Sequence, residues 1–292
     1  LTSFPSLCVK SQRLQNIDAP PKRQIFGSSR IILTRERPQK ENKASYEEAS
    51  PLQMTPIGLE PLKQFEEPQT DKLVFTFTED EDMIDNKAST SRISTMISNI
   101  CHLTSLTLNF QMDILKMKEN IITDEFVHKL SSQVLFNLQG LRSLTLIFRN
   151  CEQITDKGVS DIVFYGLKGF INLTSLELDF FACQITDKGV NDLALHGLKS
   201  LTSLTSLSLD FNESKITGKG VSDLACEGLR HLSQLKSLAL NFLCCDKAID
   251  EVLAILACHG LRHLSQLETL YLAPNSSVTD KGIDGLISQG LQ

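Results

Sequence analysis

Apolar residues recur at a fixed spacing along most of the chain. The pattern LxxLxLxF, in which x is usually polar, has clear copies at 103–110, 141–148, 173–180, 204–211 and 235–242. LETLYLAP (267–274) is a degenerate last copy, and LVFTF (73–77) aligns with the second half of the pattern. The second leucine falls at 73, 106, 144, 176, 207, 238 and 270, so the usual repeat is 31 or 32 residues long.

Each repeat predicts a strand followed by a helix. Leu176, Leu178 and Phe180 alternate with Glu177 and Asp179, which is the period of two expected of a half-buried strand. Ten residues later the apolar period changes to that of one helix face. This face comprises Val190, Leu193, Ala194, Gly197 and Leu198. Strands that are joined through helices on one side must run parallel and pack into a curved stack.

A polar motif separates the strand from the helix. QITDKGV occurs at 153–159 and 184–190, KITGKGV at 215–221 and SVTDKGI at 277–283. Thr155 is placed to cap a helix, Asp156 to put negative charge near the positive helix end, and Gly158 to let the first turn pack closely against a neighbouring repeat. A repeated active site is the alternative, but catalysis needs one converging set of groups rather than a ladder of equivalent ones. We therefore interpret the motif as structural.

With these motifs, residues 73–292 resemble leucine-rich repeat proteins. The period and the Cys-x-x-Ile-Thr-Asp pattern are similar to those of the ribonuclease-inhibitor-like and cysteine-containing subtypes. Cys151 and Cys183 come seven residues after the marker leucine rather than five, which we interpret as a strand longer by one in–out pair. The resemblance implies an α/β solenoid of about seven repeats of 31–32 residues, with parallel strands on the concave face and helices on the convex face.

Neither the cysteines nor the polar motifs predict a catalytic, cofactor or metal site. In the resembled family, the position of Cys151 and Cys183 forms a buried ladder that satisfies loop backbone groups. A second set, Cys226 and Cys258 with His231 and His263, could hold zinc, but two near-identical repeats explain it as a duplication. The sequence has no phosphate-binding loop, no His-Glu-x-x-His and no nucleophile elbow. We expect a protein that is not an enzyme.

Charge divides the chain into two parts. Residues 1–43 hold nine Lys/Arg against three Asp/Glu, whereas the whole chain has a net charge of −6. Eight of the nine prolines precede residue 70. We expect 1–70 to be a basic, Pro-rich leader, disordered or extended, and 71–292 to be the repeat domain. Arg30, Arg35 and Arg37 of the leader are candidates to contact an acidic protein or RNA surface.

Strand residues that point away from the core are the main candidates for partner binding. We expect them to line the concave face, with a short acidic centre that suits a partner with a basic surface or the basic leader itself. A solvated sheet surface without a partner is the alternative. Few aromatic or arginine anchors are visible on this face. The candidates are Asn109, Glu177, Asp179, Ser208, Asp210, Asn241 and Tyr271.

One repeat carries an insertion that could form a second contact. The spacing from 106 to 144 is 38 residues, and the extra residues fall around MDILKMKENI (112–121). We expect this insertion to protrude at one rim and to expose apolar side chains. These are Met112, Ile114, Leu115 and Met117.

The preferred function is a protein-interaction scaffold or structural subunit of a larger intracellular assembly. One alternative is the substrate receptor of a ubiquitin ligase, which requires an F-box in an N-terminus that this sequence does not contain. Another is an inhibitor that covers an enzyme with its concave face. No apolar run reaches the roughly 18 residues of a membrane helix. We expect a cytoplasmic protein, with the cilium, the cytoskeleton or an organelle matrix as alternatives.

Overall fold

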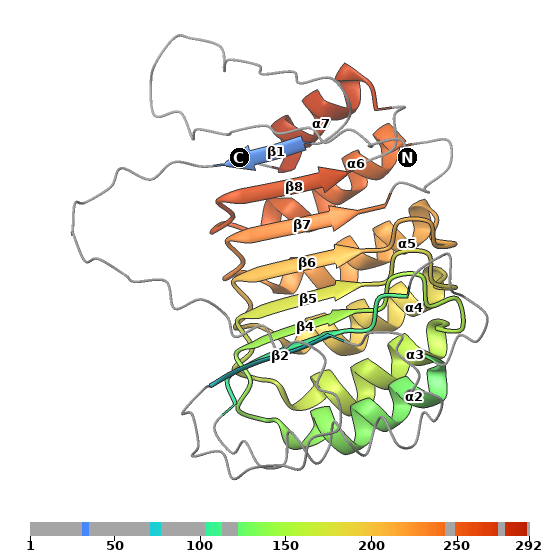
Figure 1. Ribbon diagram of the computed structural model, residues 1–292. Coiled ribbons are helices and arrows are strands. Elements are labelled where there is room, and N and C mark those ends of the chain that lie inside the picture. Colours follow the sequence, from blue (N-terminus) through green and yellow to red (C-terminus); the bar gives the residue numbers. More distant parts are fainter. Residues whose placement is uncertain are drawn as a thin grey trace, which may run out of the picture.

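The described part of the chain forms one sheet backed by one layer of helices. A computed structural model describes residues 71–76, 103–112, 122–242, 249–273 and 278–290, together with the backbone of 31–34. The sheet has eight strands in the order β1-β8-β7-β6-β5-β4-β3-β2. Figure 1 shows the helices on one side of this sheet. The strands are β1 (Ile31–Thr34), β2 (Lys72–Thr76), β3 (Ser105–Asn109), β4 (Ser143–Ile147), β5 (Ser175–Asp179), β6 (Ser206–Asp210), β7 (Ser237–Asn241) and β8 (Thr269–Ala273).

The marker leucines set the register of the sheet. Strands β2 to β8 pair in parallel and in sequence, each with the next. Leu73 pairs with Leu106, and the marker leucines continue opposite one another through to Leu270. The prediction of seven repeats in an α/β leucine-rich repeat solenoid is confirmed, including the short first copy at 73–77. Below, a strand and the turn and helix that follow it are called, for example, the β4 repeat.

Short helices return the chain to the start of the next strand. They are α2 (Asp124–Lys129), α3 (Asp156–Asp161), α4 (Asp187–Asp192), α5 (Gly218–Asp223), α6 (Ile249–Ile255) and α7 (Asp280–Gly290). From α2 to α6, each α-helix widens into a π-helical turn of five residues and then tightens into a 3₁₀ turn of three. The predicted face Val190–Leu198 is buried along these three segments in the β5 repeat, although the helix is not uniformly α.

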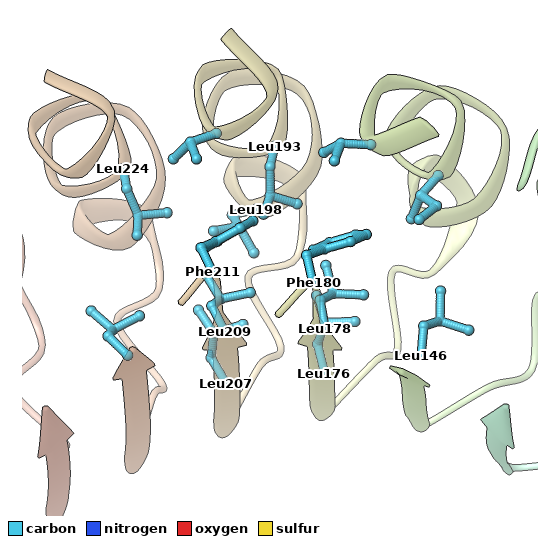
Figure 2. Packing of buried hydrophobic residues seen from close by; sticks show 14 of the residues in the cluster. Leu146, Leu176, Leu178, Phe180, Leu193, Leu198, Leu207, Leu209, Phe211 and Leu224 are labelled. Carbon is cyan, nitrogen blue, oxygen red and sulfur yellow. The ribbon is translucent and has the colours of Figure 1, made fainter. Parts of the chain in front are cut away.

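The core lies between the sheet and the helices. Leu176, Leu178 and Phe180 of the β5 repeat point into this layer and meet Leu193 and Leu198 from the helical segment (Figure 2). The phenylalanines that follow successive strands form a stack parallel to the solenoid axis. Ring centroids lie 5.1, 5.7, 5.7 and 6.0 Å apart along Phe110, Phe148, Phe180, Phe211 and Phe242. Each ring therefore buries its faces against the neighbouring repeats, not within its own.

Backbone pairing between repeats continues beyond the regular strands. The strands stop at Ile147 and Asp179, but the Phe148 N–H donates to the Asp179 carbonyl at 2.8 Å and the Asn150 N–H donates to the Phe181 carbonyl at 2.9 Å. Two residues after Phe148 and Phe180, Asn150 and Ala182 adopt φ values of 62° and 57°. Glu213 does the same at 58° in the β6 repeat. This left-handed step turns the chain toward the helix.

In several repeats, an aspartate at the start of the helix binds the following repeat. The Asp156 carboxylate accepts hydrogen bonds from the Thr186 N–H at 2.8 Å, the Thr186 hydroxyl at 2.7 Å and the Gly189 N–H at 3.1 Å. Asp124 makes the same three bonds to the β4 repeat, and Asp187 makes them to the β6 repeat. We call this set of bonds the aspartate staple. The sequence predicted only that these aspartates place negative charge near the positive helix end. The structure shows that they also bind the neighbouring repeat.

The threonine and glycine of the motif complete the staple. The Thr155, Thr186 and Thr217 hydroxyls each accept from the N–H two residues later, which confirms the predicted caps. A Cβ added to Gly189 would lie 2.6 Å from Asp156 Oδ1, so only glycine admits the carboxylate. Gly218 replaces the aspartate in the β6 repeat, and the next repeat lacks the Ile-Thr pair that such an aspartate would bind.

One segment of the predicted leader belongs to the sheet. Strand β1 pairs antiparallel with β8, with Ile32 opposite Tyr271, and covers the edge that no parallel strand occupies (Figure 1). A free strand edge would expose unpaired backbone groups. Strand β1 thus lies before the predicted boundary at residue 70 in the sequence but belongs to the same sheet as the repeat strands.

Asp187→Ala should lower the free energy of unfolding by about 2 kcal/mol, because it leaves two N–H groups and one hydroxyl of the β6 repeat without their charged acceptor. Asp280→Ala is the matched control, since Asp280 is exposed and makes no hydrogen bond to a described residue. Its effect should stay within about 0.5 kcal/mol. Urea titration followed by circular dichroism measures both, and equal losses would show that the staple does not stabilise the fold.

Phe180→Ala should cost about 4 kcal/mol of stability, because the cavity would open between two neighbouring rings of the stack. The control is Phe181→Ala, one residue further on, whose ring is only half buried. That change should cost about 1 kcal/mol, mainly through the lost contact with Arg149. The same urea titration serves, and the stack has no special role if the two losses match.

Candidate functional site

The seven predicted concave residues lie in two rows across the sheet. Strand register places Glu177 beside Ser208 in one row, which runs from Thr107 on β3 to Tyr271 on β8. The second row follows the last strand residues and contains Asn109, Asp179, Asp210 and Asn241. Glu177 is exposed, and the other six are half buried. The structure therefore brings these residues onto one face, with Asn109 and Tyr271 at opposite ends.

Hydrogen bonds join the centre of the second row. Arg149 Nε donates to Asp179 Oδ2 at 2.7 Å, and its terminal nitrogen lies 3.4 Å from Asp210 Oδ2. Asn241 Nδ2 donates to the same Asp210 oxygen at 3.0 Å. We call Arg149, Glu177, Asp179 and Asp210 the acidic cluster. It spans the β4, β5 and β6 repeats and has one cation for three carboxylates.

The pKa of Asp179 is raised above its ordinary value. Burial of its carboxyl raises this pKa, and the nearby charge of Asp210 raises it further. The Phe181 N–H and the Arg149 guanidinium lower it, but they do not cancel the two larger effects. The Asp179 carboxylate therefore carries its charge at a free-energy cost that an additional cation would reduce.

Sequence reasoning missed Arg149 as part of this site. It lies two residues beyond the last strand residue of β4, in a loop that the strand pattern does not include. Its guanidinium carbon is 4.7 Å from the centre of the Phe181 ring, so an aromatic ring of the next repeat helps to hold the guanidinium beside Asp179 and Asp210. An alignment of the repeats could have identified it. The residue after the strand phenylalanine is Gln111, Phe181 or Asn212 in the neighbouring repeats, and a cation only in the β4 repeat.

The other predicted contacts fall largely outside the described residues. Met112 is half buried and packs against the hydrophobic core, so it does not protrude as expected. Ile114, Leu115 and Met117 lie outside the described residues, as do Arg30, Arg35 and Arg37.

The buried cysteines have structural surroundings. Cys151 Sγ donates to the Phe110 carbonyl at 3.4 Å, and Cys183 Sγ donates to the Phe148 carbonyl at 3.1 Å. Both bonds reach back to the preceding repeat, as the resemblance implied. Burial raises the pKa of both thiols, that of Cys183 to about 12. Thiols that stay protonated are poor nucleophiles and poor metal ligands.

Three further findings concern the described residues alone. Among them, no three His, Cys, Asp or Glu side chains gather as they would around a metal ion. The Cys258 thiol donates to Gln289 Oε1 at 2.7 Å. No helix in the same part of the chain is long and apolar enough to span a bilayer.

Comparisons with known proteins agree with the repeat geometry. A family model described as "Leucine Rich repeat" matches residues 200–225. No protein with a curated description shows significant sequence similarity to the chain.

Two solved structures are similar to parts of the chain. Internalin C2 of Listeria monocytogenes is 23% identical, with 60% of this chain and 64% of that chain covered and a TM-score of 0.33. The yeast Rad7 and Elc1 complex is 20% identical, with 57% and 44% covered and a TM-score of 0.37. The match thus spans less than two thirds of either structure's chain, and scores this low support no inference about partners.

The fold and the matched segment lead to one conclusion. Seven parallel strands lie in leucine-marked register, and a described helical segment follows each strand from β3 to β8 on the same side of the sheet. They repeat the unit that the family model identifies within residues 200–225. Solenoids of this kind commonly present their concave surface to protein partners. The chain has the fold of a leucine-rich repeat solenoid, and its residues 200–225 match the leucine-rich repeat family model.

Proposed function

We propose that the protein is a non-catalytic interaction scaffold whose concave face binds a basic segment of a protein partner. The acidic cluster is the observation that carries this proposal. Arg149 shares its guanidinium between two aspartates, and Glu177 beside them is exposed. An approaching lysine or arginine would add the cation that the cluster lacks.

The roles of the repeated polar residues support a scaffold rather than an enzyme. The threonines, aspartates and glycines of the motif bind one another between repeats, so their hydrogen-bonding groups are occupied. The free thiols of Cys151 and Cys183 are buried and protonated. Such thiols persist in a reducing compartment, and we therefore propose a cytoplasmic location.

Binding of a basic probe tests the proposal directly. A fluorescent eight-residue peptide of alternating lysine and serine should bind the full chain, and Asp179→Asn/Asp210→Asn should weaken this binding about tenfold. The matched control is Glu152→Gln/Glu213→Gln, which removes the same charge from exposed loop positions. Fluorescence anisotropy at 50 and 300 mM salt gives the affinities. Equal losses in the two variants would overturn the proposal, because the peptide would then respond only to net charge.

The acidic cluster should also make stability depend on pH. Because the native pKa of Asp179 is raised, the folded chain holds this proton more tightly than the unfolded chain. Its contribution to stability should be greatest when it is protonated and should fall as pH rises from about 4 through the native pKa. Urea unfolding at pH 4, 5, 6 and 7 should show the wild type losing stability relative to Asp179→Asn. A constant difference across this range would contradict the assignment.

A further inference from the structure

Four cations form a line along the edge where the helical segments return to the strands. Each takes the second position of the 3₁₀ turn in its repeat, directly after a buried leucine. A backbone hydrogen bond of 2.9 or 3.0 Å to that leucine closes every turn, so the same local geometry lies beneath each exposed side chain. We call this line the basic row. It consists of Lys168, Lys199, Arg230 and Arg262.

The charges of the basic row are not compensated. Within the described residues, none of the four takes part in a salt bridge, whereas other cations of the chain do. Burial lowers the pKa of His231, and Lys199 and Arg230 lower it further, whereas the Glu227 carboxylate opposes them without reversing the shift. This edge therefore carries excess positive charge in a chain whose net charge is −6.

Apolar side chains are exposed at one end of the row. Phe136 takes the position of the cations in the β3 repeat, and the β4 repeat adds three more residues beside Lys168. Their exposed fractions are 57% for Phe136, 45% for Phe164, 42% for Tyr165 and 66% for Ile171. We call these four residues the apolar end. Large hydrophobic residues exposed together mark a contact surface more often than single ones do.

The composition changes as soon as the next repeat begins. In the β5 repeat the positions of Phe164, Tyr165 and Ile171 hold Leu195, His196 and Thr202. Leu195 is half buried, and the other two are polar. The surface is thus apolar over two repeats and basic over the following three, a change that the repeat geometry itself does not require.

We propose that the basic row and the apolar end together bind an extended acidic peptide segment of a partner protein. The segment crosses the repeats, with one apolar side chain on the apolar end and its carboxylates on the four cations. This surface lies at the amino ends of the strands, away from the acidic cluster at their carboxyl ends, and the inference does not depend on the proposed function.

The spacing of the repeats suits such a segment. Neighbouring strands lie about 4.8 Å apart and packed helices about 8–10 Å apart, so cations in the turns between them have an intermediate spacing. Alternate residues of an extended peptide are about 6.6 Å apart. A carboxylate at every second residue can therefore meet one cation per repeat.

The shape of the charged region favours a peptide over a nucleic acid. The basic row places one cation per repeat, and the chain as a whole has a net charge of −6, so a long polyanion would meet net repulsion. Cations in the last turn of a helix also complement its dipole, by about 0.3–1 kcal/mol each. That effect accounts for one cation per helix but not for the exposed aromatic residues at the end of the row.

Direct binding of a designed peptide tests the inference. The probe is a fluorescent peptide of one phenylalanine followed by alternating glutamate and serine, in both sequence directions, added to the full chain. Lys199→Glu/Arg230→Glu should weaken binding at least about tenfold by placing like charges together. Lys157→Glu/Lys188→Glu is the matched control, because it changes charge equally at exposed positions near the carboxyl ends of the strands. Its affinity should change less, by about twofold.

Two further measurements decide between the possible ligands. Phe164→Ser should weaken the peptide that carries phenylalanine but not the same peptide with serine in its place, and circular dichroism should show an unchanged fold. Equal effects of the two charge variants, or tighter binding of a single-stranded oligonucleotide of equal charge, would overturn the inference. Asp179→Asn/Asp210→Asn should leave acidic-peptide binding intact, so failure here is distinguishable from failure of the concave site.

Discussion

Each repeat depends on its neighbours to bury its apolar residues and to satisfy its polar groups. The marker leucines pair across seven parallel strands, and the phenylalanine rings stack between repeats rather than within them. The Asp156 carboxylate satisfies backbone N–H groups of the repeat that follows. A single repeat would leave these groups exposed or unpaired, so the stack is stable only as a continuous series.

This dependence restricts where function can lie. The motif residues that recur from repeat to repeat are occupied by the core or by the aspartate staple. Groups left available to a partner are exposed side chains outside the motif, and some of these differ between repeats. Arg149, Glu177 and Phe164 are such residues, because the equivalent positions in neighbouring repeats hold side chains of another kind. Variation from repeat to repeat is thus a better guide to binding than the repeated motif itself.

The sequence predicted those features that lie within one repeat. The alternation around Leu176 and Leu178 indicated the strand, and the capping role of Thr186 follows from residue type and position. Contacts between repeats were harder to predict, since residues 30 or 61 positions apart meet only through the stacking geometry. The bonds from Asp156 to Thr186 and from Arg149 to Asp210 are of this kind. Met112 was misjudged because an apolar side chain in a loop can still pack against the core.

The parallel arrangement of the helices also sorts charge between the two edges of the solenoid. All the helical segments run in one direction, so their positive ends align at one edge and their negative ends at the other. Aspartates are favoured at the first edge, where the staple also uses them, and cations such as Arg230 are favoured at the second. The charge preference at the two ends of each helix therefore gives the two edges of the solenoid opposite charge. Once the edges differ in charge, local differences such as Arg149 or Phe164 distinguish one part of an edge from the next, and both proposed binding surfaces rest on such differences.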